Sequence, residues 1–154
     1  MDWSDQECWT LGDSIKLAKL LPQAGVDILD VSSGGNHHDQ RIDIHPYYQV
    51  DLAGMIRHEL HAEDVGLLVA AVGFIDKATM AESIVHCRRS EIDYKSGQGN
   101  GNNMDKQEKR GPQADLVLVG REFLRDTGFV LKAASDLNVK VQWPLQYLKG
   151  QNSK

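Results

Sequence analysis

The sequence predicts an α/β protein whose strands run parallel. Three short apolar segments, 26–31, 67–72 and 116–119, alternate with stretches in which apolar residues recur at helical spacing. These segments are too far apart in the chain for hairpins, so helical crossovers must join them, and such crossovers link parallel strands. Each segment also runs into a turn that contains glycine, where α/β folds place their ligand sites.

The first helix is predicted to begin after Thr10. Thr10 and Asp13 have the spacing of a capping box, in which each side chain accepts a hydrogen bond from the other residue's backbone. Gly25 is expected to end the helix, because glycine readily takes the left-handed conformation that follows a helix. Four apolar residues lie between them at helical spacing: Leu11, Ile15, Ala18 and Leu21.

The other elements follow from the same patterns. The segment 67–72 is nearly all apolar, which is typical of a strand covered on both faces, and 116–119 is expected to be buried as well. Three further helices are marked by apolar residues at helical spacing: Leu52, Met55, Ile56 and Leu60; Met80, Ala81, Ile84 and Val85; and Phe129, Val130, Ala133, Ala134 and Leu137. The predicted order of elements is therefore α-β-α-β-α-β-α.

Residues 86–112 interrupt this alternation. The segment has almost no apolar side chains and contains the glycine- and asparagine-rich run 96–103. Such a composition cannot offset the entropy of being ordered, so a flexible surface insertion is predicted. The domain is expected to span 1–150, and 151–154 a disordered tail.

Composition and charge exclude several classes of function. The chain has 154 residues and a formal net charge of -5, whereas a nucleic-acid surface needs a basic stripe. No apolar run approaches the roughly 20 residues that span a bilayer. Cys8 and Cys87 fit neither a CxxC motif nor a disulfide framework. We therefore expect a cytoplasmic protein that binds neither nucleic acid nor membrane.

The most informative stretch follows the last apolar segment. Gly120 comes directly after Val119, and Arg121 stands where the next helix is expected to start. The glycine lets the backbone approach a ligand, free N–H groups at a helix start point outward, and the guanidinium adds a fixed charge. Gly73 ends the preceding segment in a similar way. This pattern favours a phosphate site, and the alternative for Arg121 is a salt bridge with a neighbouring carboxylate.

Other polar residues are predicted to be structural. Four residues of one loop invite a metal hypothesis, but they lack the regular spacing of zinc ligands, so no metal is expected: His37, His38, Asp39 and His45. Ser32 and Ser33 stand outside a G-x-S-x-G elbow, which argues against a hydrolase. Arg125 and Asp126 are expected to pair with each other.

Five blocks of residues occur in an order that is typical of one known family: Asp27–Asn36, Tyr48–Val50, Ala71–Gly73, Ala114–Asp126 and Trp143–Tyr147. They resemble the last third to half of the old yellow enzyme family, nearest to its NADPH dehydrogenase branch. The likeness covers nearly the whole chain outside 86–112. One departure is that the family's Pro-Gly-Tyr-Gln is here Pro46-Tyr47-Tyr48-Gln49, which predicts a different path for that loop.

The resemblance implies an FMN-dependent oxidoreductase, in which hydride passes from NADPH through FMN to an activated alkene. It also implies a (β/α)8 TIM barrel of which this chain forms the C-terminal part, strands six to eight with their helices. Gly120 and Arg121 would hold the FMN phosphate, and Gly73 would offer a backbone N–H to it. Ser32 would lie near the flavin or its ribityl chain.

The resemblance implies an incomplete barrel as well. Three strands cannot close, so the first strand's open edge and the inner faces of the helices would stay exposed unless the chain dimerised, paired with the missing N-terminal half or folded into an open doubly wound sheet. The family's residues for binding the unsaturated carbonyl substrate belong to that half. No catalytic residue is therefore assigned, and the chain alone is expected to be inactive. The alternatives are a non-catalytic phosphate- or nucleotide-binding α/β module and an unstable truncated remnant.

Overall fold

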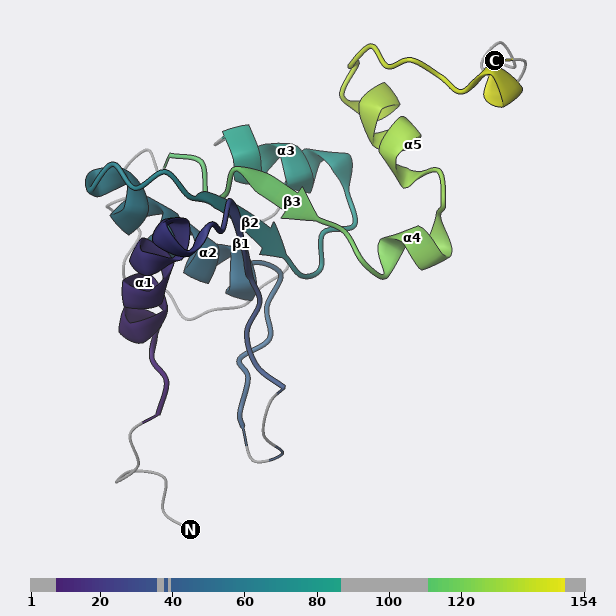
Figure 1. Cartoon of the computed structure of the whole chain (residues 1–154). Helices are drawn as coiled ribbons and strands as arrows, with labels where there is room; N and C mark the ends of the chain where they lie inside the picture. Colours follow the sequence, from purple (N-terminus) through teal and green to yellow (C-terminus); the bar gives the residue numbers. More distant parts are fainter. Residues whose placement is uncertain (1–7, 36–37, 39, 87–110, 149–154) are drawn as a thin grey trace, which may run out of the picture.

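A computed structural model describes residues 8–35, 38, 40–86 and 111–148, and its elements follow the predicted order as far as the last strand, after which two helices stand where one was predicted (Figure 1). The elements are α1 Leu11–Leu20, β1 Ile28–Val31, α2 Tyr48–Ala62, β2 Leu68–Val72, α3 Ala78–His86, β3 Leu116–Leu118, α4 Glu122–Arg125 and α5 Phe129–Asp136. Residues 87–110, nearly all of the predicted insertion, and the predicted tail 151–154 lie outside the described residues. In the described ranges, no helix is both long and apolar enough to cross a membrane.

The three strands form one parallel sheet, which confirms the predicted strand direction. The order is β1-β2-β3, so each strand pairs with its neighbour in sequence. Ile28 is opposite Leu68, and Ala70 is opposite Leu116. The crossover from β1 to β2 runs through α2. A three-stranded parallel sheet with this order is compatible with part of a barrel.

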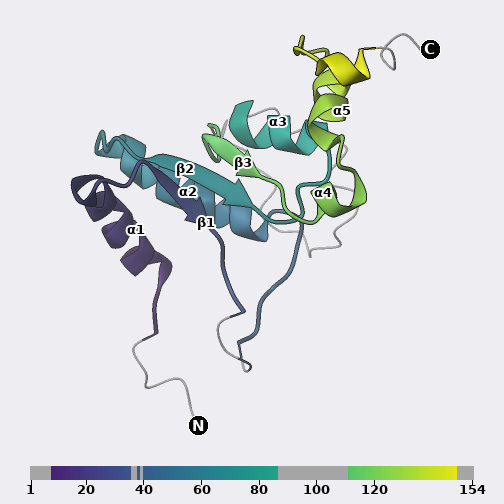
Figure 2. The same ribbon diagram turned by 45° about the vertical axis from the view of Figure 1, so that its right-hand side comes forward.

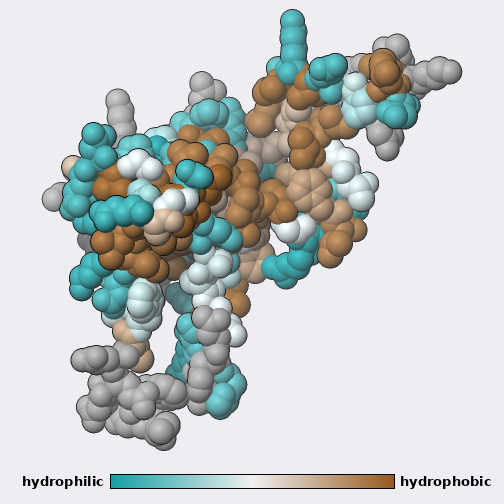
Figure 3. Space-filling model, viewed as in Figure 1, coloured by the Kyte–Doolittle hydropathy of each residue, from teal (hydrophilic) through white to brown (hydrophobic). Residues whose placement is uncertain are grey.

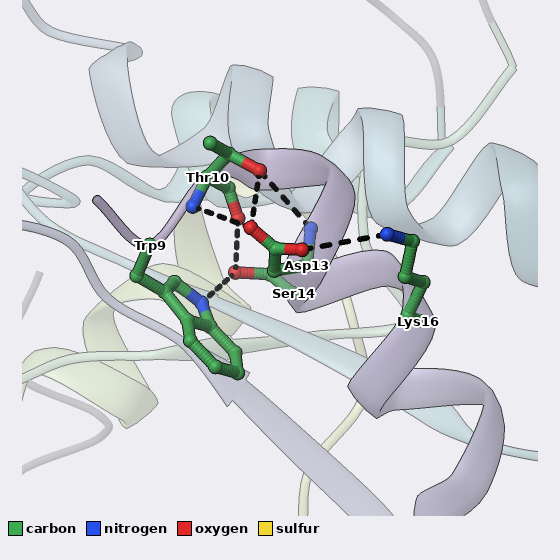
Figure 4. Close-up of polar contacts among 5 residues, drawn as sticks. All are labelled: Trp9, Thr10, Asp13, Ser14 and Lys16. Atoms are coloured by element: carbon green, nitrogen blue, oxygen red, sulfur yellow. Dashed lines mark hydrogen bonds and ion pairs between the residues drawn. The ribbon is translucent and has the colours of Figure 1, made fainter. Parts of the chain in front are cut away.

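The predicted capping box begins α1 (Figure 4). The Asp13 N–H donates to Thr10 Oγ1 at 3.2 Å, and the Thr10 N–H donates to Asp13 Oδ2 at 3.1 Å. The Thr10 hydroxyl also donates to Asp13 Oδ2, at 2.6 Å. After α1 the chain tightens into a 3-10 turn, Leu21–Ala24, which ends at Gly25 with φ 81°. The predicted ends of this helix are both confirmed.

This cap makes a pH-dependent contribution to stability. The hydroxyl and the N–H of Thr10 hold the pKa of Asp13 below its usual value of 3.8. A lowered folded-state pKa stabilises the fold above the unfolded-state value, and that stabilisation is lost as pH falls through the folded-state pKa. We expect Thr10→Val to raise the Asp13 pKa toward 3.8 in a carboxyl carbon NMR titration. An unchanged Asp13 pKa in this variant would contradict the role given to the Thr10 hydroxyl. Asp13→Asn should remove the part of the pH dependence of stability that comes from titration of Asp13.

The core lies between the sheet and α2 and α3. Val31, Val69 and Ala71 point to the helical side because strand side chains alternate between the two faces. They pack with buried residues of the helices: Val50, Ala53, Ile56, Leu60 and Ile84. α1 covers α2 from outside with the buried Ala18, and Lys19 Nζ reaches Glu63 Oε1 at 2.6 Å.

The opposite face of the sheet is open. Four apolar side chains on it are substantially exposed: Ile28 by 49%, Leu68 by 48%, Leu116 by 38% and Leu118 by 40%. The prediction that 116–119 is buried is therefore wrong. The prediction that 67–72 is covered on both faces holds only in part, because Leu68 is exposed whereas Ala70 on the same face is fully buried. The inner faces of α2 and α3, which were expected to be exposed, are instead buried against the sheet, and the exposed apolar surface is this face of the strands. Figure 3 shows such surface over the sheet and over α4 and α5.

A polar network ties the start of β3 to β2 and α2. Arg57 Nε donates to Asp115 Oδ1 at 2.8 Å, and the Arg57 guanidinium also reaches the Pro112 carbonyl at 3.1 Å. The Val69 N–H donates to the other Asp115 oxygen at 2.9 Å. Both charged side chains are mostly buried. This network fixes where the chain enters β3 after residues 87–110.

One predicted ion pair is replaced by two others. Arg125 pairs with Glu122 at 3.0 Å rather than with Asp126, because the two lie one turn apart on α4. Asp126 instead accepts the Gly128 N–H at 2.9 Å and reaches Lys132 at 3.4 Å, which joins α4 to α5. Figures 1 and 2 show α4 and α5 beyond the β3 side of the sheet, at the opposite end from α1.

Candidate functional site

The ends of the three strands lie along one edge of the sheet. Val31 is opposite Ala71, and Val72 is opposite Leu118. Ser32 and Gly73 directly follow the paired residues of β1 and β2, and Gly120 follows β3 after one residue. We call residues 32–34, 73–74 and 119–121 the C-terminal sheet edge. The sequence-predicted residues thus converge on one edge because parallel strands all end on the same side.

Arg121 is exposed at this edge and stands at the N-cap of α4. Within the described residues its guanidinium makes neither an ion pair nor a hydrogen bond. Its Cζ instead lies 5.4 Å from the centroid of the Phe74 ring. The alternative interpretation of Arg121, a salt bridge with a neighbouring carboxylate, finds no partner among these residues.

The two glycines of the edge differ in backbone conformation and in the space around them. Gly73 has φ 106°, and a Cβ added there would come 2.5 Å from Gln49 Nε2. Its backbone conformation therefore favours glycine, and a Cβ there would force the Gln49 carboxamide to shift. Gly120 has no positive φ, and a Cβ there would meet no atom within 4 Å. The space beside Gly120 is open to a ligand.

Gln49 links the ends of β1 and β2. It is buried near the start of α2, where its Oε1 accepts the Ser33 N–H at 2.9 Å and its Nε2 donates to Tyr48 Oη at 2.6 Å. The same carboxamide packs on Gly73. Ser32, the residue predicted to contact the cofactor, is exposed beside this contact, while its neighbour Ser33 is tied to Gln49.

An aromatic series continues the edge toward Arg121. The rings of Tyr48 and Phe74 have centroids 6.1 Å apart, and His45 meets Tyr48 edge-on at 6.1 Å. Sequence reasoning missed Gln49 and Phe74 as site residues. Gln49 lies in one of the blocks that resemble the family, which was a usable signal. The role of Phe74 depends on its backbone angle, and no residue pattern reports that angle.

The loop before α2 accommodates the bulky residue that replaces the family's glycine. Tyr47 is the N-cap of α2 with φ -113°, an ordinary conformation for a residue with a side chain. Of the loop residues weighed as metal ligands, His37 and Asp39 lie outside the described residues. In the described ranges, no three His, Cys, Asp or Glu side chains come together as metal ligands would.

Two cavities flank the edge. One of about 260 Å³ lies between the end of β1 and the start of α2 and is lined by Ser33, Gly34 and Tyr48, among others. The other, of about 310 Å³, lies between the β2–α3 connection and α5, with the opposite charges of Asp76 and Lys132 on its wall. Arg121 lines neither of these two cavities.

The two glycines provide a matched pair for mutation. We expect Gly73→Ala to destabilise the fold by roughly 1–2 kcal/mol, because alanine is strained at positive φ and its Cβ would collide with Gln49. Gly120→Ala should leave the free energy of unfolding almost unchanged. Urea unfolding followed by circular dichroism measures both. Equal stability of the two variants would contradict the assigned backbone at Gly73.

These features define an α/β protein with a cationic, glycine-containing edge at the carboxyl ends of its strands. No protein-family model matches the chain. It is 36% identical over 141 residues to NADPH dehydrogenase of Geobacillus thermodenitrificans, which covers 92% of this chain and 33% of the relative. NADPH dehydrogenase of Bacillus subtilis is 35% identical over 91% of the chain and 32% of its own length. NADH:flavin oxidoreductase of Gibberella zeae is 36% identical over 88% of the chain and 27% of its own length.

These matches confirm the resemblance to the old yellow enzyme family, because the relatives are named NADPH dehydrogenase and NADH:flavin oxidoreductase. The chain spans about a third of the length of the curated relatives that it matches. The likeness therefore concerns one portion of an NADPH dehydrogenase, and that portion includes the C-terminal sheet edge.

Proposed function

We propose that the chain is the phosphate-binding segment of an FMN-dependent oxidoreductase that uses NADPH to reduce an activated alkene. The observation that carries this proposal is the Arg121 guanidinium, which has no ion-pair partner within the described residues and lies next to the open space at Gly120, on the same edge as Gly73. The similarity to NADPH dehydrogenases and to a flavin oxidoreductase supports it.

The residues of the edge fit the phosphate end of FMN. A dianionic phosphate takes charge-assisted hydrogen bonds from a guanidinium, and it needs backbone that no side chain shields. Arg121 would provide the charge, and Gly120 and Gly73 would let the backbone approach. Ser32 is exposed on the same edge, after β1, and would meet the ribityl chain. When bound, FMN would supply the hydride transfer between NADPH and the alkene.

The other residues of the edge would keep it preorganised. Gln49 fixes the end of β1 against the turn at Gly73, so the two backbone segments cannot move apart independently. A preorganised site loses less entropy on binding than a flexible one. No residue of this chain is proposed to move a proton or to bind the alkene.

We expect the isolated chain to bind FMN but not to catalyse alkene reduction. The apolar sheet face carrying Ile28, Leu68, Leu116 and Leu118 has no covering layer among the described residues. The curated relatives are about three times as long as the matched portion. A polypeptide equivalent to the unmatched part of these relatives, or a second copy of the chain, would cover that face. The former would also supply the residues that bind the unsaturated carbonyl substrate.

Titration with FMN and riboflavin tests the proposal, because riboflavin lacks only the phosphate. FMN should bind more tightly than riboflavin, and inorganic phosphate should compete with FMN alone. The isolated chain should show no alkene reduction with NADPH. Appreciable turnover would refute the proposal that catalysis depends on a polypeptide equivalent to the unmatched part of the relatives. Equal affinity for the two flavins would overturn the phosphate site. If the chain binds FMN but NADPH does not bleach the flavin, even when a polypeptide equivalent to the unmatched part of the relatives is added, the non-catalytic module is favoured.

A further inference from the structure

Phe74 adopts a backbone conformation that bulky residues rarely take. Its φ is 52°, directly after Gly73 with φ 106°. An aromatic residue in this region is a genuine outlier and stores strain. The ring is also 45% exposed, so burial does not explain its presence. Glycine would relieve the strain, which means that the ring itself needs an explanation.

The Phe74 ring contacts both Arg121 and Tyr48. The Arg121 Cζ lies 5.4 Å from the centroid of the ring. The centroid of the Tyr48 ring lies 6.1 Å away, at an interplanar angle of 57°. Tyr48 is anchored in turn through its hydroxyl to the buried Gln49. The ends of β2 and β3 are thus connected through an aromatic ring rather than through an acid.

The chemistry of this contact differs from that of a salt bridge. A carboxylate partner would occupy the N–H donors of Arg121 and neutralise its charge. An aromatic face attracts the cation while leaving those donors available to an oxyanion. We propose that Phe74 is a positioning residue that holds the Arg121 guanidinium at the C-terminal sheet edge, ready for a phosphate. This inference rests on the proposed function and gives Phe74, in the turn after β2, a role in the proposed phosphate site.

The full chain and two variants test this role. Phe74→Leu removes the aromatic face and keeps an apolar side chain, whereas Phe74→Tyr keeps the face. Dissociation constants for FMN and riboflavin are measured by flavin fluorescence. We expect Phe74→Leu to weaken FMN binding about two- to fivefold, the range of an exposed cation–π contact, with riboflavin unchanged. Phe74→Tyr should restore the wild-type ratio. A purely structural role would weaken both flavins together and would overturn the proposal.

A second measurement needs no ligand. The side-chain protons of Arg121 should show an upfield ring-current shift in NMR spectra of the wild type and of Phe74→Tyr, and lose it in Phe74→Leu. Absence of the ring-current shift in the wild type would overturn the proposed stacking.

The outcomes separate the two proposals. If the wild type prefers FMN to riboflavin and Phe74→Leu prefers it equally, Phe74 has no positioning role while the phosphate site stands. If the wild type does not distinguish the flavins, the phosphate site fails, and the positioning role fails with it.

Discussion

Arg121→Ala is expected to weaken FMN binding by about 1.5–3 kcal/mol, the contribution of a charge-assisted hydrogen bond. The effect should be large because no carboxylate among the described residues pairs with the Arg121 guanidinium. All of its N–H groups are therefore available to donate hydrogen bonds to the phosphate. Calorimetric titration with FMN measures it. Riboflavin affinity should stay constant, since the variant removes only the partner of the phosphate.

The controls separate local chemistry from general charge. Arg125→Ala removes a cation four positions along, on α4, where the side chain pairs with Glu122. We expect FMN affinity there to remain within about twofold, because the Arg125 charge is already paired with Glu122 and Arg125 is not part of the C-terminal sheet edge. Arg121→Lys should recover part of the affinity, as lysine keeps the charge but lacks the planar fork. Unchanged FMN affinity in Arg121→Ala would remove this residue from the site.

Asp115→Ala is expected to lower the free energy of unfolding by about 2–3 kcal/mol. The variant leaves the Arg57 guanidinium without its carboxylate and the Val69 N–H without its acceptor. Removing one partner of a fully buried ion pair lowers the free energy of unfolding by more than this. Here the effect should be smaller, because the two side chains are still 17% and 18% exposed. Urea unfolding measures the change.

A matched control is Asp27→Ala. Asp27 precedes β1, is exposed and makes no ion pair within the described residues, so this variant should stay within about 0.5 kcal/mol of the wild type. The double variant with Arg57→Ala should be less destabilised than the sum of the single variants, because the two residues share one interaction. Strict additivity would mean that the ion pair contributes nothing.

The open sheet face connects stability with function. Side chains at Ile28, Leu68 and Leu116 are apolar although they lie on a surface. Apolar patches of this kind mark interaction surfaces on proteins. The same strands end at the C-terminal sheet edge, so whatever covers the face would also lie beside the proposed phosphate site.

Several features could be predicted from the sequence because they depend on local patterns. The capping box at Thr10 and Asp13 and the left-handed Gly25 follow from residue type and spacing within one helix. The parallel direction of the strands follows from the length of chain between them. Parallel strands end on one side, so the convergence of Gly73 and Arg121 also followed from the sequence.

Only the tertiary structure decided how the site is held together. The carboxamide of Gln49 meets Ser33 and Gly73 because α2 packs under the sheet, and no spacing along the chain encodes that meeting. The pairing of Arg57 with Asp115 spans 58 positions, and the exposure of Leu68 depends on which layers are present. Local sequence patterns determined the elements and their direction. Long-range packing determined which side chains position Arg121, because side chains distant in sequence meet only in the folded chain.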